Sequence, residues 1–281
     1  MSCQNSDMPD LTQQELFLSF CKNTAHSAGA MALEYFRKPL KKERKKDNSV
    51  VTEADLAVQK FIESQVAEAY PEHCFFGEEL GKSESSGLAE FRWVVDPIDG
   101  TTVFSQGLPG WAVSIGLLHR DRPLVGCVYL PVTDEMYSAA HDLPSLWIVD
   151  YSGQAVTHVN EVVKDHDPRS FLTLTGSEFH RRFDSNLPGK QRSLGSTAHH
   201  LCLVARGIGN ISFMRPFVWD IAAAGLILER AGGSLLCWED EQPYCMEEHM
   251  APGTSRPVIA AVNNVETLRL AKKLIVRKID K

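Results

Sequence analysis

The chain has 281 residues, of which 43% are hydrophobic and 23% are charged, a composition typical of a globular protein. Its 29 basic and 36 acidic side chains leave a net charge of −7, which argues against nucleic-acid binding because such proteins carry a basic excess. No apolar run is long enough for a transmembrane helix, and the polar N-terminus is unlike a signal peptide. We expect a cytoplasmic protein with no nucleic-acid or membrane partner.

The cysteines do not indicate a metal site or a disulfide framework. There are seven of them, they are scattered, and no two form a CxxC pair. They are typical of small apolar core residues in a reducing compartment.

The N-terminal part predicts two helices. Thr12–Glu15 has the form of a capping box, and the helical pattern that follows it extends to the residues just before Pro39. The segment 37–46 then holds seven basic residues and one acid. We interpret it as a solvated loop, with a mobile arm near an anionic ligand as the alternative. Thr52 is the expected N-cap of a second helix that ends at Pro71.

Short apolar runs rich in β-branched and aromatic residues follow, and each fits a strand. The turn 119–123 is expected to join two of these strands as an antiparallel pair, and Pro97 is expected to end another because it has no N–H to donate. The predicted strands cover residues 74–76, 93–95, 112–118, 125–130 and 136–140.

From about residue 150 the predicted strands and helices alternate. Gly232-Gly233 is expected to end one of these helices, and 265–279 is expected to be the last helix. Two helices, then strands, then an alternating part indicate an α+β or α/β layered fold. We divide the chain into an N-terminal half, 1–150, and a C-terminal half, 151–281. The strands predicted in the second half are 171–175, 191–194, 211–214, 234–238 and 258–262, and the earlier helices are 197–206 and 221–231.

The stretch Trp93–Thr102 reads WVVDPIDGTT and carries two acids at the end of a strand. Asp96 and Asp99 would repel each other, and burial would increase the repulsion. A hard divalent cation such as Mg²⁺ relieves it, because Mg²⁺ prefers oxygen ligands. The N–H groups after Asp99 would also suit a phosphate oxygen. The alternative is a strand-end turn in which Asp99 caps a helix.

Three other acids, like Asp96 and Asp99, stand at the end of a predicted strand or at the start of a predicted helix. Glu78 follows a strand in Gly77-Glu78-Glu79, Asp220 precedes an apolar helix, and Asp55 lies in the first turn of the second helix. Taken alone, each has a structural explanation as a surface acid, an N-cap or a carboxylate that stabilises the helix dipole.

Together, four motifs resemble those of the inositol monophosphatase-type, Mg²⁺-dependent phosphomonoesterases. They are VVTEAD ending in Asp55, FFGEE with Glu78, WVVDPIDGTT and WDIAAAGLILERAGG, and they stand in the family's order over residues 52–233. The resemblance implies a sandwich of alternating α-β-α-β-α layers. It also implies a phosphoric monoester hydrolase inhibited by lithium and assembled as a homodimer.

The resemblance implies two or three Mg²⁺ ions per active site. The ligands it implies are Glu78, Asp96 and the Ile98 carbonyl for the first ion, Asp96, Asp99 and Asp220 for the second, and Glu78 with Asp55 for a third.

By the same resemblance, Glu78 and Thr101 would orient the attacking water, with Asp99 as a further catalytic residue. The amides of Gly100 and Thr101 would receive phosphate oxygens. Gly195-Ser196-Thr197 would line the substrate side of the pocket, although a plain helix start explains it equally well. Metal coordination lowers the pKa of a water, so direct attack by that water needs no Ser, Cys or His nucleophile.

Three departures concern the substrate. Phe213 stands where inositol-preferring relatives carry a carboxylate that binds sugar hydroxyls. Arg215, close by, would contact a second anionic group or simply be a solvated surface residue. Val103 and Gln106 replace an Asn and a later His, and 141–153 contains a single glycine where the family has glycine-rich turns.

The resulting hypothesis is an inositol monophosphatase-like enzyme that hydrolyses a small phosphorylated metabolite. The same chemistry on histidinol phosphate, fructose 1,6-bisphosphate or a 3′-phosphonucleotide remains open, because Phe213 replaces the hydroxyl-binding acid. A catalytically silent metal-binding scaffold is the alternative of a different class.

Overall fold

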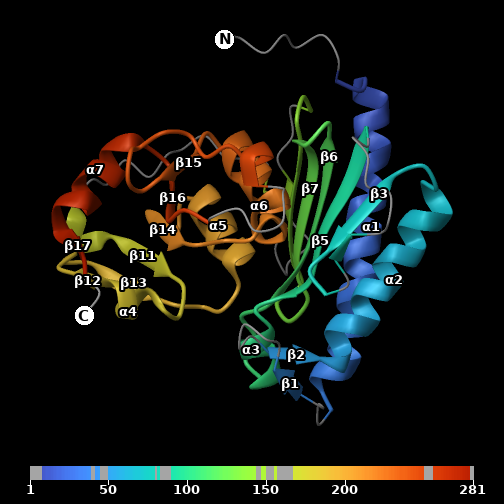
Figure 1. The fold of residues 1–281 in the computed structure, drawn as a ribbon, viewed down its shortest axis with the longest axis horizontal. Helices are drawn as coiled ribbons and strands as arrows, with labels where there is room; N and C mark the ends of the chain where they lie inside the picture. The colour runs from blue at the N-terminus through green and yellow to red at the C-terminus, as the bar shows by residue number, and fades with distance from the viewer. Residues whose placement is uncertain are drawn as a thin grey trace.

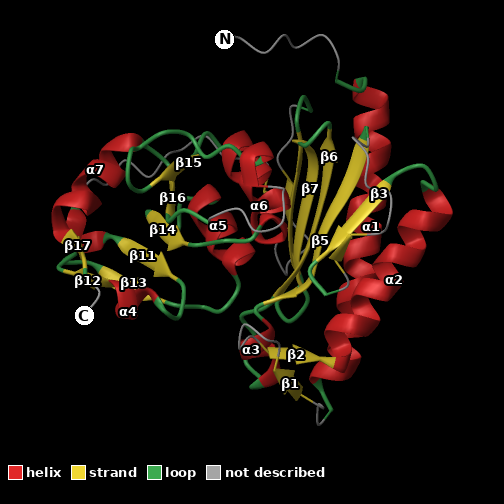
Figure 2. Ribbon diagram, viewed as in Figure 1, coloured by secondary structure: helices red, strands yellow, loops and turns green. Residues whose placement is uncertain are grey.

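Helices and sheets alternate through the molecule as five layers (Figure 1, Figure 2). The structure is a computed structural model that describes residues 8–38, 42–44, 50–79, 81–82, 90–143, 147–149, 155–156, 167–249 and 256–278. Two long helices cover an eight-stranded sheet, two further helices cover its other face, and a five-stranded sheet with one more helix follows. The predicted α-β-α-β-α sandwich is confirmed.

The outer layer consists of α1 (Leu11–Phe36) and α2 (Glu53–Ala69). The capping box expected at Thr12–Glu15 is wrong: the N-cap of α1 is Asp10, whose Oδ1 accepts a hydrogen bond from Gln13 N at 2.8 Å. Asp10 has the extended backbone of an N-cap, whereas Thr12 is already helical and cannot serve as one.

The expected N-cap of α2 is confirmed. Thr52 Oγ accepts from Ala54 N, and the Asp55 carboxylate accepts from Thr52 N at 2.8 Å. Thr52 also ends a small hairpin formed by β1 (Lys42–Arg44) and β2 (Val50–Thr52). Part of the basic segment 37–46 therefore lies in a strand, and its residues 39–41, 45 and 46 lie outside the described residues.

The large sheet has the strand order β10-β9-β8-β7-β6-β5-β3-β4, and its neighbours are antiparallel except for β3 and β5. The turn at Arg120 and Asp121 joins β6 and β7 as predicted, with positive φ at both residues. The strands are β3 (Cys74–Gly77), β4 (Gly81–Lys82), β5 (Phe91–Asp99), β6 (Ala112–His119), β7 (Arg122–Leu130), β8 (Glu135–Ala140), β9 (Trp147–Val149) and β10 (Ala155–Val156).

Strand β5 does not end at Pro97, contrary to the expectation. Asp96 pairs with Ser114 and Asp99 pairs with Ala112, so the register shifts between them. A proline cannot donate to the ladder, and the chain accommodates it as an irregularity between two paired positions. As a result, Asp96 and Asp99 both belong to one strand.

The middle layer consists of α5 (Thr197–Ala205) and α6 (Val218–Arg230). Glycines of the large sheet allow α6 to approach closely. A Cβ atom at Gly116 would lie 2.9 Å from Ala222 Cβ, and one at Gly126 would lie 2.7 Å from Ala223 O. Helix α6 ends at the predicted glycine pair, where Gly232 has φ of 84° and Gly233 N donates to Leu228 O.

The second sheet has the order β13-β11-β14-β16-β15 and mixes parallel and antiparallel pairs. Helix α7 (Val265–Leu274) covers it but is shorter than the predicted 265–279, because Ile275–Arg277 forms β17 and pairs with β12. The remaining elements are β11 (Leu172–Thr175), α4 (Phe179–Arg182), β12 (Phe183–Ser185), β13 (Lys190–Arg192), β14 (Ile211–Met214), β15 (Ser234–Cys237) and β16 (Ile259–Val262).

The interior is apolar, and the buried hydrophobic residues of the described part of the chain form three clusters. One core cluster joins the large sheet to α5 and α6, and a second fills the space between that sheet and α1 and α2. Of the helices in the described part of the chain, none is long and apolar enough to cross a membrane. The boundary expected near residue 150, and most of the departure at 141–153, lie outside the described residues.

Candidate active site

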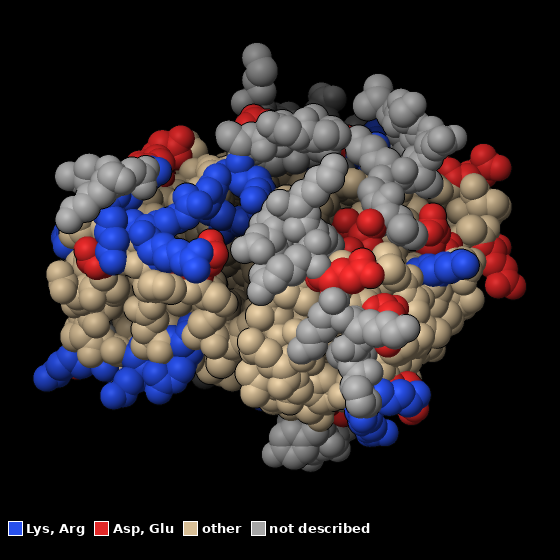
Figure 3. Space-filling view, turned by 60° about the horizontal axis from the view of Figure 1, so that its bottom comes forward, with Lys and Arg blue, Asp and Glu red and all other residues tan. Residues whose placement is uncertain are grey.

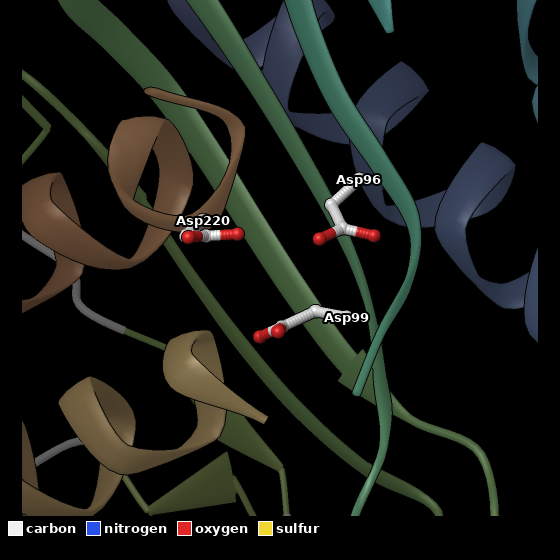
Figure 4. A group of neighbouring side chains, drawn as sticks. All are labelled: Asp96, Asp99 and Asp220. Carbon is white, nitrogen blue, oxygen red and sulfur yellow. The ribbon is translucent and has the colours of Figure 1, made fainter. Parts of the chain in front are cut away.

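Three carboxylates from two elements meet between the large sheet and the middle helices. Asp96 and Asp99 come from β5, and Asp220 comes from the first turn of α6. One oxygen of each lies within 4.8 Å of the others. Figure 4 shows the three side chains around the space between β5 and α6. Residues 124 positions apart in the sequence therefore form one acidic cluster.

Local backbone structure holds each carboxylate in place. Asp96 Oδ1 accepts from Ile98 N at 3.1 Å, across the irregular part of β5. Asp220 Oδ2 accepts from Phe217 N at 2.7 Å, which satisfies a free donor at the start of α6. Because backbone groups fix both side chains, the two carboxylates are oriented in advance of any ligand.

The start of α5 holds Asp99. Its carboxylate accepts from Ser196 Oγ at 2.6 Å, Thr197 N at 3.1 Å and Ala198 N at 2.6 Å. These donors belong to the positive end of the helix, which stabilises an anion. Asp99 is not the N-cap of the short helix α3 (Thr101–Ser105), because Gly100 occupies that position with φ of 98°. The alternative that Asp99 is simply a helix cap is therefore wrong for α3.

Burial and mutual repulsion raise the pKa values of the cluster. Burial raises the pKa of Asp99 to about 6, opposed by its hydrogen bonds from Ser196 and α5. Burial, with repulsion from the neighbouring acids, raises the pKa values of Asp96 and Asp220 well above the ordinary value. Like charges held this close in a buried site call for a cation.

Asp55 lies beside the cluster and is linked to it through Thr101. Thr101 Oγ lies 2.9 Å from Asp55 Oδ1 and 3.1 Å from the Ile98 carbonyl oxygen. The Asp55 carboxylate also accepts from Thr52 Oγ at 2.6 Å. Burial raises the pKa of Asp55, against the effect of its hydrogen bonds from Thr52 and Thr101.

Glu78 extends the acidic site from β3. Its charge raises the pKa values of Asp55, Asp96, Asp99 and Asp220, although Glu78 is not among the three carboxylates that lie within 4.8 Å of one another. The backbone there is held by the buried Gln59 of α2, whose Oε1 accepts from Glu79 N at 2.8 Å. The hydrogen bond from Glu79 N to Gln59 therefore fixes the backbone next to Glu78.

The residues expected on the substrate side fall into two groups. Ser196 lies against the cluster, because it is fully buried, donates to Asp99 and caps α5, and Gly195 precedes it with φ of 113°. Thr197, Phe213 and Arg215 line a separate cavity of about 280 Å³ next to the cluster. Phe213 is only 2% exposed and packs on Trp238, with ring centroids 4.9 Å apart.

Sequence reasoning missed three residues of this region. Gln59 is an interior helix position whose partner lies twenty residues away, and Arg182 and Arg256 line the cavity beside Arg215. None of the three belongs to a motif. Only Arg215, one residue before a proline in the stretch leading to Asp220, carried a sequence indication.

The donor set fits Mg²⁺. The cluster offers carboxylate oxygens, which are ligands that a hard cation prefers. Among the described residues, no histidine or cysteine belongs to the cluster, which disfavours zinc and other softer metals. The arrangement can hold cations and, through them, attract a phosphate to an acidic protein.

Comparison with known proteins agrees with this geometry. Residues 13–277 match the model of the "Inositol monophosphatase family". Inositol monophosphatase 1 of Bos taurus is 31% identical over 271 residues, which cover 90% of this chain and 94% of the relative. A fructose-1,6-bisphosphatase/inositol-1-monophosphatase of Aquifex aeolicus is 33% identical over 231 residues, covering 77% of this chain and 84% of the relative.

A solved structure extends the likeness to the fold. The inositol monophosphatase from Anabaena superimposes with a TM-score of 0.72 at 26% identity, covering 92% of this chain and 95% of the other. Because the sequence match covers most of the chain and the layered fold is shared, the chain belongs to the inositol monophosphatase family.

Proposed function

We propose that this protein is a Mg²⁺-dependent phosphatase that hydrolyses small phosphorylated alcohols by direct transfer of the phosphoryl group to water. The observation that carries the proposal is the convergence of Asp96, Asp99 and Asp220 within 4.8 Å in a buried site. Phosphatase names among the similar proteins support the same activity.

The ligand sets follow from the resemblance to the family, supported for Asp96, Asp99 and Asp220 by their convergence within 4.8 Å. Glu78, Asp96 and the Ile98 carbonyl would hold one ion, Asp96, Asp99 and Asp220 a second, and Glu78 with Asp55 a third. When bound, Mg²⁺ lowers the pKa of a coordinated water and neutralises charge that develops on the phosphoryl oxygens.

The protein's own groups position the reactants. The Thr101 hydroxyl, which donates to Asp55 at 2.9 Å, would orient the attacking water together with Glu78. Because the Thr101 hydroxyl donates its hydrogen to Asp55, its oxygen lone pairs are available to accept a hydrogen bond from the attacking water. Asp55 can also take up the proton that the water loses. The amides of Gly100 and Thr101 at the start of α3 would receive phosphoryl oxygens.

A phosphate-release assay tests the proposal. Inositol, sugar, amino-alcohol and nucleotide monophosphates are each incubated with the protein in Mg²⁺, in EDTA, and in EDTA followed by excess Mg²⁺. We expect release from at least one substrate that disappears with the chelator and returns with the metal. Undiminished release in EDTA contradicts the metal assignment, and no release from any substrate contradicts the activity.

Two further features belong to the same proposal. The family relationship supports inhibition by lithium, which a titration with LiCl against KCl as the control tests in the same assay. It also supports a homodimer, which sedimentation of the full chain tests. A sedimenting monomer with full activity would contradict the assembly but not the chemistry.

A further inference from the structure

Gln59 of α2 is a fully buried polar residue that contacts the chain on both sides of Glu78. Its Oε1 accepts a hydrogen bond from Glu79 N at 2.8 Å. Its carboxamide also packs against the backbone of Gly77, because a Cβ atom placed there would lie 2.6 Å from Gln59 Nε2. One side chain therefore holds both residues that flank Glu78.

The large sheet holds the same segment through β5. Glu78 N donates to Val95 O at 3.1 Å, and Val95 directly precedes Asp96. Asp55 lies one helical turn before Gln59, on the same face of α2. The backbone of Glu78 is thus fixed between β5, which carries Asp96, and α2, which carries Asp55.

Hydrogen bonding within the fold does not account fully for an amide at this position. Gln59 Nε2 is buried and has no hydrogen-bond partner among the described residues, and an unsatisfied buried donor costs free energy. An aliphatic side chain of similar length would avoid that cost. What it would not supply is the acceptor for Glu79 N.

The amide is also uncharged, which suits an acidic site that is to take up cations. A Lys or Arg in this position would compete with a metal ion for Glu78, and a further carboxylate would increase the repulsion within the site. Figure 3 shows that Lys and Arg side chains instead form a band across the C-terminal half, at the left. Gln59 holds the backbone of Glu78 without adding a charge of either sign.

We propose that Gln59 is a positioning residue that sets the Mg²⁺ affinity of the site by fixing the backbone on both sides of Glu78. The inference rests on the proposed phosphatase function, in which Glu78 is a metal ligand. A ligand that is already held in place loses less conformational freedom when it binds an ion, so the ion is bound more tightly. Gln59 acts through Glu78 rather than on the substrate.

Isothermal titration calorimetry with MgCl2 on the EDTA-treated full chain tests the proposal without an activity assay. Gln59→Met removes the acceptor at similar volume, and we expect the Kd for Mg²⁺ to rise about tenfold. Gln59→Glu keeps an oxygen that can accept from Glu79 N, so its Kd should not exceed about three times the wild-type value. A wild-type Kd in Gln59→Met, or an equal loss in both variants, contradicts the role of this acceptor.

Gly77→Ala is an independent variant, because the new Cβ displaces the same carboxamide while residue 59 stays a glutamine. We expect a rise in the Kd for Mg²⁺ similar to that of Gln59→Met. An unchanged Kd in Gly77→Ala contradicts the proposal even if Gln59→Met does not fold.

Gln14→Met is the matched control. Gln14 is equally buried, but its hydrogen bonds are structural: its Oε1 accepts from Asp142 N at 3.0 Å, and its Nε2 donates to Pro9 O at 2.8 Å. It lies in the first turns of α1, at the far end of the large sheet from α3 (Figure 1).

Urea denaturation in EDTA measures the free energy of unfolding of each variant. Gln14→Met should be destabilised and keep the wild-type Kd for Mg²⁺. If it loses Mg²⁺ affinity as Gln59→Met does, general loosening of the fold is responsible and the inference is overturned. A wild-type chain that binds no Mg²⁺ overturns the proposed function as well, whereas a wild type that binds and a Gln59→Met that binds equally overturn this inference alone.

Discussion

Asp99 combines two interactions that a metal site needs. Its carboxylate accepts three hydrogen bonds from the start of α5, and it lies within 4.8 Å of Asp96 and Asp220. The helix dipole and the donors stabilise the ionised form, and repulsion from the other acids opposes it. The side chain is thereby held in place where a cation would bind.

Asp99→Asn tests this arrangement. The amide removes the negative charge and cannot reproduce all the hydrogen bonds with α5, so we expect kcat to fall by a factor of about 10² or more in the phosphate-release assay. Asp184→Asn is the control, because that acid forms an exposed pair with Lys278 far from the cluster. A folded Asp99→Asn enzyme with wild-type kcat would refute the role of Asp99.

Thr101 supports a second prediction at this scale. Thr101→Val keeps the shape and removes the hydroxyl that contacts Asp55, so kcat should fall by about 10². Thr101→Ser restores the hydroxyl and should recover most of the activity. If steady-state kinetics show the same loss for Ser and Val, the lost packing rather than the hydroxyl is responsible.

At the scale of elements, the site is assembled from the beginnings of helices against one strand. α5 holds Asp99, α6 carries Asp220, and the irregular end of β5 presents Asp96 and Asp99 together. The placement of Asp220 depends on how closely α6 approaches the sheet. That approach depends on glycines, since any side chain at Gly126 would meet the backbone of Ala223.

Gly126→Ala should therefore affect both stability and the site. The added Cβ would lie 2.7 Å from Ala223 O, which forces α6 away from β7 and should reduce the free energy of unfolding by about 1–3 kcal/mol. The shift of α6 should also weaken Mg²⁺ binding, measured as the rise in melting temperature on adding the metal.

Gly176→Ala is the matched control for stability, because no atom of the residues that the structure describes lies within 4 Å of a Cβ placed there. Urea denaturation of both variants separates the two positions. Equal free energies of unfolding for Gly126→Ala and the wild type would contradict the close-packing argument.

At the scale of the whole molecule, the half-buried His73 and the buried His200 make stability depend on pH. Burial lowers the pKa of His73 to about 4 and that of His200 to about 3, from an ordinary value of 6.5. His200 Nε2 accepts from Leu194 N at 3.0 Å, which requires that nitrogen to be unprotonated. Because the folded state holds these imidazoles neutral, their contribution to the free energy of unfolding is fully present at and above pH 6.5. This contribution is lost as the pH falls from 6.5 toward 4 and 3.

We expect the free energy of unfolding of His200→Gln to fall less steeply than that of the wild type between pH 6.5 and 4. Glutamine can still accept the bond from Leu194 but has no proton to take up in this range. The exposed His180→Gln serves as the control. Urea unfolding in EDTA at several pH values measures the slopes, and their difference isolates the histidine from the acidic cluster. Identical slopes for wild type and His200→Gln would contradict this explanation.

The elements predicted from local pattern agree closely with the structure where the local signal is strong. Thr52 caps α2, the turn at 119–123 joins two strands, and the glycine pair ends α6, because each depends on residues within a few positions. The errors lie where distant contacts compete. The final helix ends earlier than predicted, because its expected last residues form β17 and pair with β12, which lies some ninety residues earlier in the chain.

The sequence by itself determined the family, the layered fold and the acids expected to bind metal, because motif order and hydrophobic period are written along the chain. Only the tertiary structure decided that Thr101 contacts Asp55, that Gln59 holds the backbone next to Glu78, and that Arg182 and Arg256 join Arg215 in one cavity. The reason is physical: these contacts join residues 20 to 74 positions apart, and a separation in sequence fixes no distance until the layers have packed.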